Sequence, residues 1–128
     1  MVVPILKQGP YLIATVQTAL NDTDLVELRD ALVAKVGTVR SRAVIIDVTE
    51  LDVMDSFSCR MLRDMAHMIR LRGAETLIVG IQPEVALSMV QLGLTLEGIV
   101  TALDLEEGLE YLAHNSSEVG SEIRSRGR

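Results

Sequence analysis

The feature that most constrains the fold is an apolar run in the first half of the chain, Ala43-Val44-Ile45-Ile46-Asp47-Val48. Polar and apolar residues do not alternate in it before Asp47. Strands that are covered on both faces of a sheet have this pattern, because neither face meets water. The run therefore predicts a central parallel strand in an α/β fold, with helices packed on both sides of the sheet.

Other strand patterns surround this run. Two short stretches rich in branched residues, 4–7 and 11–17, flank Gly9-Pro10 and predict an antiparallel pair joined by a tight turn. Residues 76–81 and 99–100 predict two more strands. Taken in order with the helices between them, these elements predict a mixed, mostly parallel sheet of about five strands with about four helices.

The first two helices are predicted from caps and apolar spacing. Asn21-Asp22-Thr23-Asp24 is a cluster of N-cap residues, Glu27 completes a possible capping box with Asp24, and Gly37 is expected to end the helix. The second helix is predicted over 57–72, with Gly73 as its stop. The expected buried stripes are Leu25, Leu28, Leu32 and Val36 in the first helix, and Phe57, Met61, Leu62, Met65, Met68 and Ile69 in the second.

Two shorter helices complete the prediction. Pro83 suits the first turn of a third helix, which Gly93 closes. Asp104 is expected to cap the last helix with Glu107 at the reciprocal position. After residue 113 the chain turns polar, so we predict one domain over 1–113 and a polar, disordered tail over 114–128.

Charge and composition exclude several classes of partner. The net charge is −6 and Lys7 and Lys35 are the only lysines, which argues against a nucleic-acid binder. No apolar run approaches the roughly 18 residues of a membrane span. Cys59 is the single cysteine and the N-terminus lacks the pattern of a signal peptide. We therefore expect a cytoplasmic protein that binds neither nucleic acid nor membrane.

The sequence offers little that points to an enzyme. It has no phosphate-binding loop, no dinucleotide fingerprint and no nucleophile-elbow motif. His67 and His114 do not form a convincing metal cluster with Cys59. The Cys59 thiol is either plainly packed or half-exposed, or it has a lowered pKa at a helix start. A phospho-accepting receiver domain using Asp47 is the rival hypothesis, but no lysine follows Lys35. We expect no catalysis, no metal and no cofactor.

The pair Asp55-Ser56 lies where the second helix begins, and it allows two interpretations. Either residue can simply cap the helix, which is worth about 1 kcal/mol. Alternatively, Ser56 accepts a phosphate, since helix N-termini favour anionic groups. The local pattern leaves both interpretations open.

Three stretches of the chain carry a family resemblance. Asp47-Val48-Thr49-Glu50-Leu51-Asp52-Val53-Met54-Asp55-Ser56-Phe57 resembles the signature of the STAS domain, the sulfate-transporter and anti-sigma-factor-antagonist module. Gly80-Ile81-Gln82-Pro83-Glu84-Val85-Ala86 and Thr101-Ala102-Leu103-Asp104-Leu105-Glu106-Glu107-Gly108-Leu109 are similar to the RsbS-type stressosome scaffold proteins of that group. The resemblance covers about residues 4–113 and implies a STAS fold.

The resemblance also implies partners and a modification. Scaffolds of this type form homo- and hetero-oligomers with sensory STAS paralogues (RsbR-type) and sequester a serine/threonine kinase (RsbT-type), which phosphorylates them on stress and is released; a phosphatase resets the system. The phosphorylated serine of the family falls on Ser56, with Asp55 and Phe57 as neighbours in the motif and in partner binding. Ser58 is an alternative acceptor.

A second hypothesis is a freestanding antagonist that binds an anti-sigma factor directly, without a large assembly. The sequence does not decide whether a nucleotide binds, because the wider STAS resemblance leaves that open.

Overall fold

The computed structural model describes the backbone of residues 3–126 and the side chains of residues 3–115. In chain order the elements are β1 (Ile5–Gln8), β2 (Tyr11–Thr15), α1 (Asp22–Val39), β3 (Ala43–Asp47), α2 (Ser56–Leu71), β4 (Glu75–Val79), α3 (Pro83–Gln91), β5 (Val100–Ala102) and α4 (Leu105–Arg126). Over the described residues, the predicted five strands and four helices are all present. None of these helices is both long enough and apolar enough to cross a membrane.

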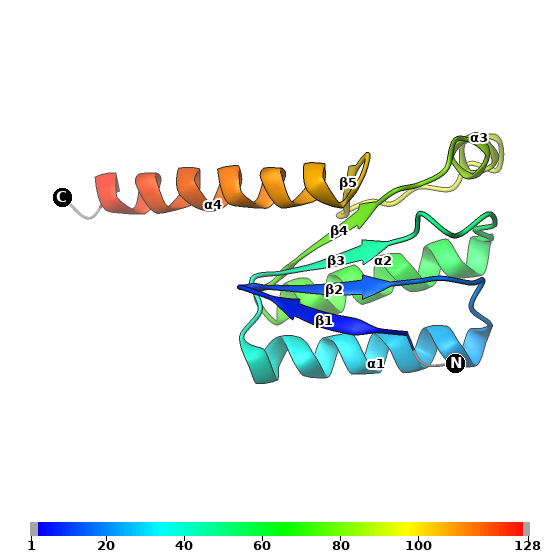
Figure 1. The fold of residues 1–128 in the computed structure, drawn as a ribbon, viewed down its shortest axis with the longest axis horizontal. Coiled ribbons are helices and arrows are strands. Elements are labelled where there is room, and N and C mark those ends of the chain that lie inside the picture. The colour runs from blue at the N-terminus through cyan, green and yellow to red at the C-terminus, as the bar shows by residue number, and fades with distance from the viewer. Residues whose placement is uncertain (1–2, 127–128) are drawn as a thin grey trace.

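The strands form one sheet in the order β1-β2-β3-β4-β5 (Figure 1). β1 pairs antiparallel with β2, and every other pairing is parallel, as the sequence predicted. β3 lies at the centre, and its first four residues are completely buried, which explains the uninterrupted apolar run.

Helices cover both faces of the sheet (Figure 1). α1 and α2 pack together on one face, over the larger of two apolar clusters. α4 crosses β3, β4 and β5 on the other face, where Leu112 is buried and Leu105 and Leu109 pack beside it. α3 lies past the carboxyl end of β4, and its Val85 and Met89 join the larger cluster.

The caps of α1 differ from the prediction. Asn21, not Asp24, is the N-cap, and its side chain accepts a hydrogen bond from the backbone N–H of Asp24 at 2.8 Å. The Asp24 carboxylate takes the reciprocal place that was assigned to Glu27. The helix also continues past Gly37, and the left-handed C-cap falls on Arg40. Within the helix, Gly37 leaves space for the Arg72 guanidinium, which a Cβ at position 37 would displace.

The predicted buried stripe of α2 is wrong at two positions. Met61, Leu62, Met65 and Ile69 are buried as expected, but Met68 is 36% exposed and Phe57 is only half-buried. Cys59 and Ala66 are buried in their place. The stripe is rotated toward these smaller residues because α2 packs closely against both α1 and β4. Gly73 follows the helix at a positive φ of 89°, as a stop signal requires.

The last helix begins as predicted. The Asp104 carboxylate accepts from the N–H of Glu107 at 2.9 Å, and the Glu107 carboxylate reaches back to the N–H of Leu103. The predicted domain boundary at residue 113 falls inside α4, whose backbone is helical to Arg126. The division into a domain over 1–113 and a tail over 114–128 stays a prediction.

Candidate functional site

The candidate site is the loop that joins β3 to α2 at the carboxyl ends of the parallel strands. Asp47, the last residue of β3, fixes the first turn of this loop: its Oδ1 accepts from the N–H of Thr49 at 3.0 Å and from the Thr49 hydroxyl at 2.6 Å. Leu51 and Met54 anchor the middle of the loop in the core, whereas Asp52 and Val53 are exposed. Asp47 therefore has a structural partner, which explains its place at the strand end without receiver chemistry.

A second segment holds the same loop from the side. The Gln82 side-chain amide donates to the Thr49 carbonyl oxygen at 2.7 Å. Gly80 has a φ of 82°, and a Cβ at this position would overlap the Thr49 hydroxyl and lie 3.1 Å from the Thr49 Cα. Only glycine combines this conformation with so close an approach. The connection from β4 to α3 therefore clamps the loop that precedes Ser56.

The sequence patterns do not predict this clamp, because Gly80 and Gln82 belong only to a stretch that carries the family resemblance. A glycine directly after a buried strand was a usable signal, because such a position often marks a positive φ or a close backbone approach. The partner of that approach, Thr49, is set by the tertiary structure alone.

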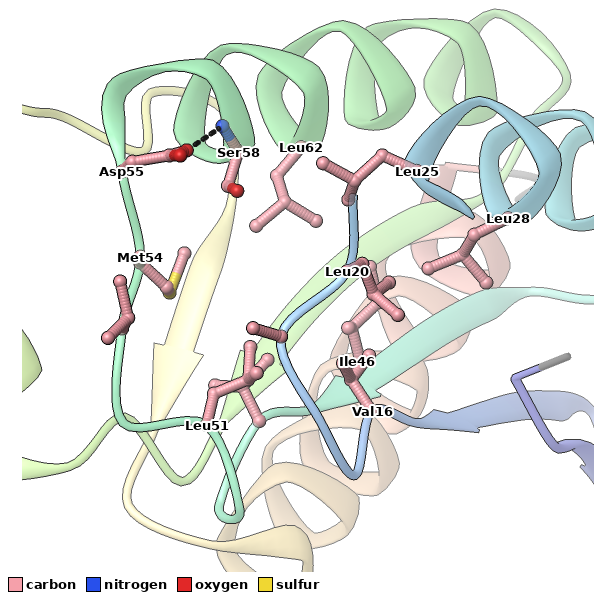
Figure 2. A pocket seen from close by; sticks show the side chains of 13 residues that line it. Val16, Leu20, Leu25, Leu28, Ile46, Leu51, Met54, Asp55, Ser58 and Leu62 are labelled. Carbon is pink, nitrogen blue, oxygen red and sulfur yellow. Dashed lines mark hydrogen bonds between the residues drawn. The ribbon is translucent and has the colours of Figure 1, made fainter. Parts of the chain in front are cut away.

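Asp55 is the N-cap of α2. It has extended backbone angles, and its Oδ1 accepts from the N–H of Ser58 at 2.8 Å (Figure 2). These hydrogen bonds from Ser58 to the carboxylate hold the pKa of Asp55 below its ordinary value. Asp55 is therefore the capping residue of the Asp55-Ser56 pair, and the Ser56 side chain is not needed as the cap.

The two candidate acceptor serines differ in environment. Ser56 is the first residue of α2 and is exposed. Ser58 is half-buried, gives its N–H to Asp55, and lines an apolar hollow. Phe57, between them, is also half-buried. An enzyme that modifies a hydroxyl must surround it, so the exposure of Ser56 favours it over Ser58.

The hollow beside Ser58 is a cavity of about 60 Å³ between the loop, α1 and α2 (Figure 2). Asp55 and Ser58 provide its polar rim, and the side chains around the rest are apolar. Figure 2 shows Leu25 and Leu28 of α1 facing Leu62 of α2 across it, with Met54 of the loop at its border. The cavity gives the site an apolar surface next to the exposed serine.

Cys59 does not have an activated thiol. Its side chain is 1% exposed, and burial raises its pKa above the ordinary thiol value. The packed-thiol interpretation is therefore confirmed. Among the described residues, no group of three or more His, Cys, Asp and Glu side chains is arranged to hold a metal ion.

Comparison with known proteins places this geometry in a family. The model of the STAS domain matches residues 3–108. The chain is 35% identical over 71 residues to the RsbT co-antagonist protein RsbRA of Bacillus subtilis, an alignment that covers 56% of this chain and 26% of that protein. The chain spans about a quarter or less of the length of the curated relatives that it matches.

Two solved structures are similar over nearly their whole length. A Ser-to-Glu variant of RsbS from Moorella thermoacetica superposes with a TM-score of 0.77 at 30% identity, covering 90% of this chain and 97% of that one. A chain from a structure of the stressosome, described as a signal integration and transduction hub, superposes with a TM-score of 0.72 at 30% identity, covering 88% and 98%. The predicted STAS fold and the resemblance to RsbS-type proteins are confirmed.

Proposed function

The chain belongs to the STAS domain family, and we propose that it is a non-catalytic stressosome scaffold whose kinase capture is switched by phosphorylation of Ser56. In this proposal the chain assembles with RsbR-type STAS paralogues in the cytoplasm. The assembly holds a serine/threonine kinase of the RsbT type until the kinase phosphorylates Ser56 and leaves. A phosphatase then restores the unmodified serine.

The observation that carries this proposal is the position of Ser56. It is an exposed hydroxyl on the first turn of α2, and the loop before it is fixed by Asp47, Gln82 and the Asp55 cap. A fixed, exposed serine gives a kinase a defined target. Because the residues around it are held by hydrogen bonds and by burial, the modification does not need to unfold the loop.

The energetics favour a switch of binding over a switch of folding. A phosphate adds a charge of about −1.5 to −2 at neutral pH. The first N–H groups of α2 have no acceptor within the helix, so they and the helix dipole favour an anion at this end. The exposed carboxylates of Asp52 and Asp55 oppose it, each by no more than about 1 kcal/mol at the surface. These contributions partly cancel, so the fold should survive while the charge of the surface changes.

The relatives support the proposed partners. RsbRA and RsbRC of Bacillus subtilis are named as co-antagonists of RsbT, and one similar structure is that of the stressosome. The chain shares its fold with the stressosome chain and part of its sequence with these co-antagonists. We therefore propose STAS paralogues and an RsbT-type kinase as its partners.

The test is incubation of the purified chain with the cognate kinase and ATP, followed by peptide mass spectrometry. We expect phosphate on Ser56, none on a Ser56→Ala variant, and retention on Ser58→Ala. Phosphate on neither serine would overturn the proposal, and phosphate on Ser58 alone would move the acceptor. Co-purification with kinase and paralogue, followed by sizing, supplies the second measurement. A very large particle is expected. Failure to form one with the paralogue would favour the freestanding antagonist instead.

A further inference from the structure

The outer surface of α2 carries a row of basic side chains that begins at Ser56. Residues 56, 60, 63, 67 and 70 are separated by four, three, four and three positions, so they share one face of the helix. After Ser56 these positions hold Arg60, Arg63, His67 and Arg70, which we call the α2 basic row.

The α2 basic row lies open at the surface. Arg60, His67 and Arg70 are exposed and Arg63 is half-buried. Arg63 donates to the Thr95 hydroxyl at 3.3 Å and Arg70 to the Gly98 carbonyl oxygen at 3.5 Å, so the row is bordered by the segment between α3 and β5. In the part of the chain that the structure describes, no carboxylate lies within 4.0 Å of the three guanidinium groups.

The three arginines of the α2 basic row have no carboxylate partner among the described residues although the chain is acidic. The net charge is −6, and 18 acidic residues are available against 12 lysines and arginines. Asp64 on the neighbouring row and Glu97 on the bordering segment are both exposed, yet neither reaches salt-bridge distance to the α2 basic row. The positive charge is therefore concentrated and available to a ligand.

We propose that the α2 basic row binds an acidic segment of a protein partner, and that a phosphate on Ser56 competes with that segment for Arg60. Helical side chains point toward the N-terminus of their helix, so Arg60 extends toward position 56 one turn earlier. An anion four residues before a cation is the favoured order for such a pair. The competition between phosphate and acidic segment rests on the proposed phosphorylation of Ser56. Binding of the acidic segment to the α2 basic row does not depend on that phosphorylation.

The occupant is an acidic protein segment and not a nucleic acid. The loop that leads to Ser56 carries the exposed carboxylates of Glu50, Asp52 and Asp55, which would repel a phosphate backbone that continued past the first residue of the row. A peptide with a few spaced carboxylates can follow the row from Arg70 to Arg60 and end there, before it meets these acidic side chains. The charge pattern of α2 fits that shorter ligand.

The binding test uses the full chain and two labelled probes in fluorescence anisotropy at low and at high salt. The first probe is a dodecapeptide that alternates Glu with Ser, and the second is a 12-nucleotide oligothymidylate. We expect the peptide to bind the wild-type chain, more weakly at high salt. The triple variant Arg60→Gln, Arg63→Gln, Arg70→Gln should bind it roughly eightfold more weakly, about twofold for each surface ion pair.

A matched control removes the same charge elsewhere. The control is a second triple variant, Lys7→Gln, Arg29→Gln, Lys35→Gln, whose substituted positions lie on β1 and α1. It should bind the peptide as tightly as the wild-type chain does. Circular dichroism checks that both variants fold. The proposal is overturned by absence of peptide binding at low salt, by equal losses in both variants, or by tighter binding of the oligonucleotide.

The competition is tested on a chain that carries phosphoserine at position 56. Its peptide binding should be at least as weak as that of Arg60→Gln. By phosphorus NMR, the second pKa of the phosphate should be lower in the wild-type background than with Arg60→Gln, because the guanidinium favours the dianion. Equal phosphate pKa values would exclude the competition. Since this chain already carries phosphoserine at position 56 and no kinase is present, the results do not depend on whether the proposed kinase acts on it.

Discussion

Removal of the α2 cap gives the most quantitative prediction. In Asp55→Ala, the N–H of Ser58 loses its 2.8 Å acceptor, and the first turn of α2 loses its only side-chain cap among the described residues. An N-cap of this kind is worth about 1 kcal/mol, with a range of about 0.5–2. For a domain of this size, that loss should lower the melting temperature by about 3–5 °C.

The negative charge of Asp55 makes its own contribution to the stability of the fold, which the Asp55→Asn variant removes while it keeps the hydrogen bond. Asparagine keeps the acceptor oxygen, so this variant should recover most of the stability. The pKa of Asp55 is lowered in the folded state by its hydrogen bonds from Ser58. Its carboxylate therefore stabilises the fold at pH values above the unfolded-state pKa, and this contribution is lost as the pH falls through the lower, folded-state pKa. The difference between wild type and Asp55→Asn should vanish in that acidic range.

The measurement is urea denaturation followed by far-UV circular dichroism at neutral and acidic pH. Asp52→Ala is the matched control, because Asp52 is an exposed acid three residues away whose side chain makes no hydrogen bond within the described residues. The capping argument would be refuted if Asp55→Ala were as stable as wild type, or if Asp55→Asn were destabilised as much as Asp55→Ala.

Three further predictions concern the supports of the site. Gly80→Ala should lower the free energy of unfolding by about 1–3 kcal/mol, because it combines a positive φ with a collision against Thr49. An unchanged melting temperature would contradict the role of Gly80 in holding the loop. Met65→Ala should lower the free energy of unfolding by about 2–5 kcal/mol, because Met65 is fully buried. Met68→Ala should lower it far less, because Met68 is 36% exposed. Equal losses of stability in denaturant would contradict the observed rotation of the α2 stripe. Cys59 should resist a thiol reagent in the native state at pH 8 and react once urea is added, since burial raises its pKa; rapid native labelling would contradict this.

The resemblance to RsbS-type proteins also acquires a physical explanation. The stretch that begins at Gly80 supports the loop before Ser56 through the Thr49 contacts, although it lies more than twenty residues away in sequence. The stretch around Asp104 builds the cap of α4, which covers the second face of the sheet. Two of the three similar segments therefore determine how the third is held or how its sheet is covered.

The sequence by itself determined the order and type of the elements. The uninterrupted apolar run of β3, the alternation of strands with helices, and Gly-Pro between the first two strands were sufficient for a mixed, mostly parallel sheet. The same local patterns predicted a helix start at Asp55-Ser56. These features are local, because they depend on backbone conformation and on which residues meet water.

Only the tertiary structure decided the details that depend on contacts between distant residues. Which side of α2 is buried depended on its packing against α1 and β4, and the neighbour of Gly37, the Arg72 guanidinium, comes from the end of α2. The difference between Ser56 and Ser58 likewise follows from exposure and from the cavity that α1 and the loop form together. Spacing along a chain cannot encode such contacts, because they arise where separate elements pack against one another.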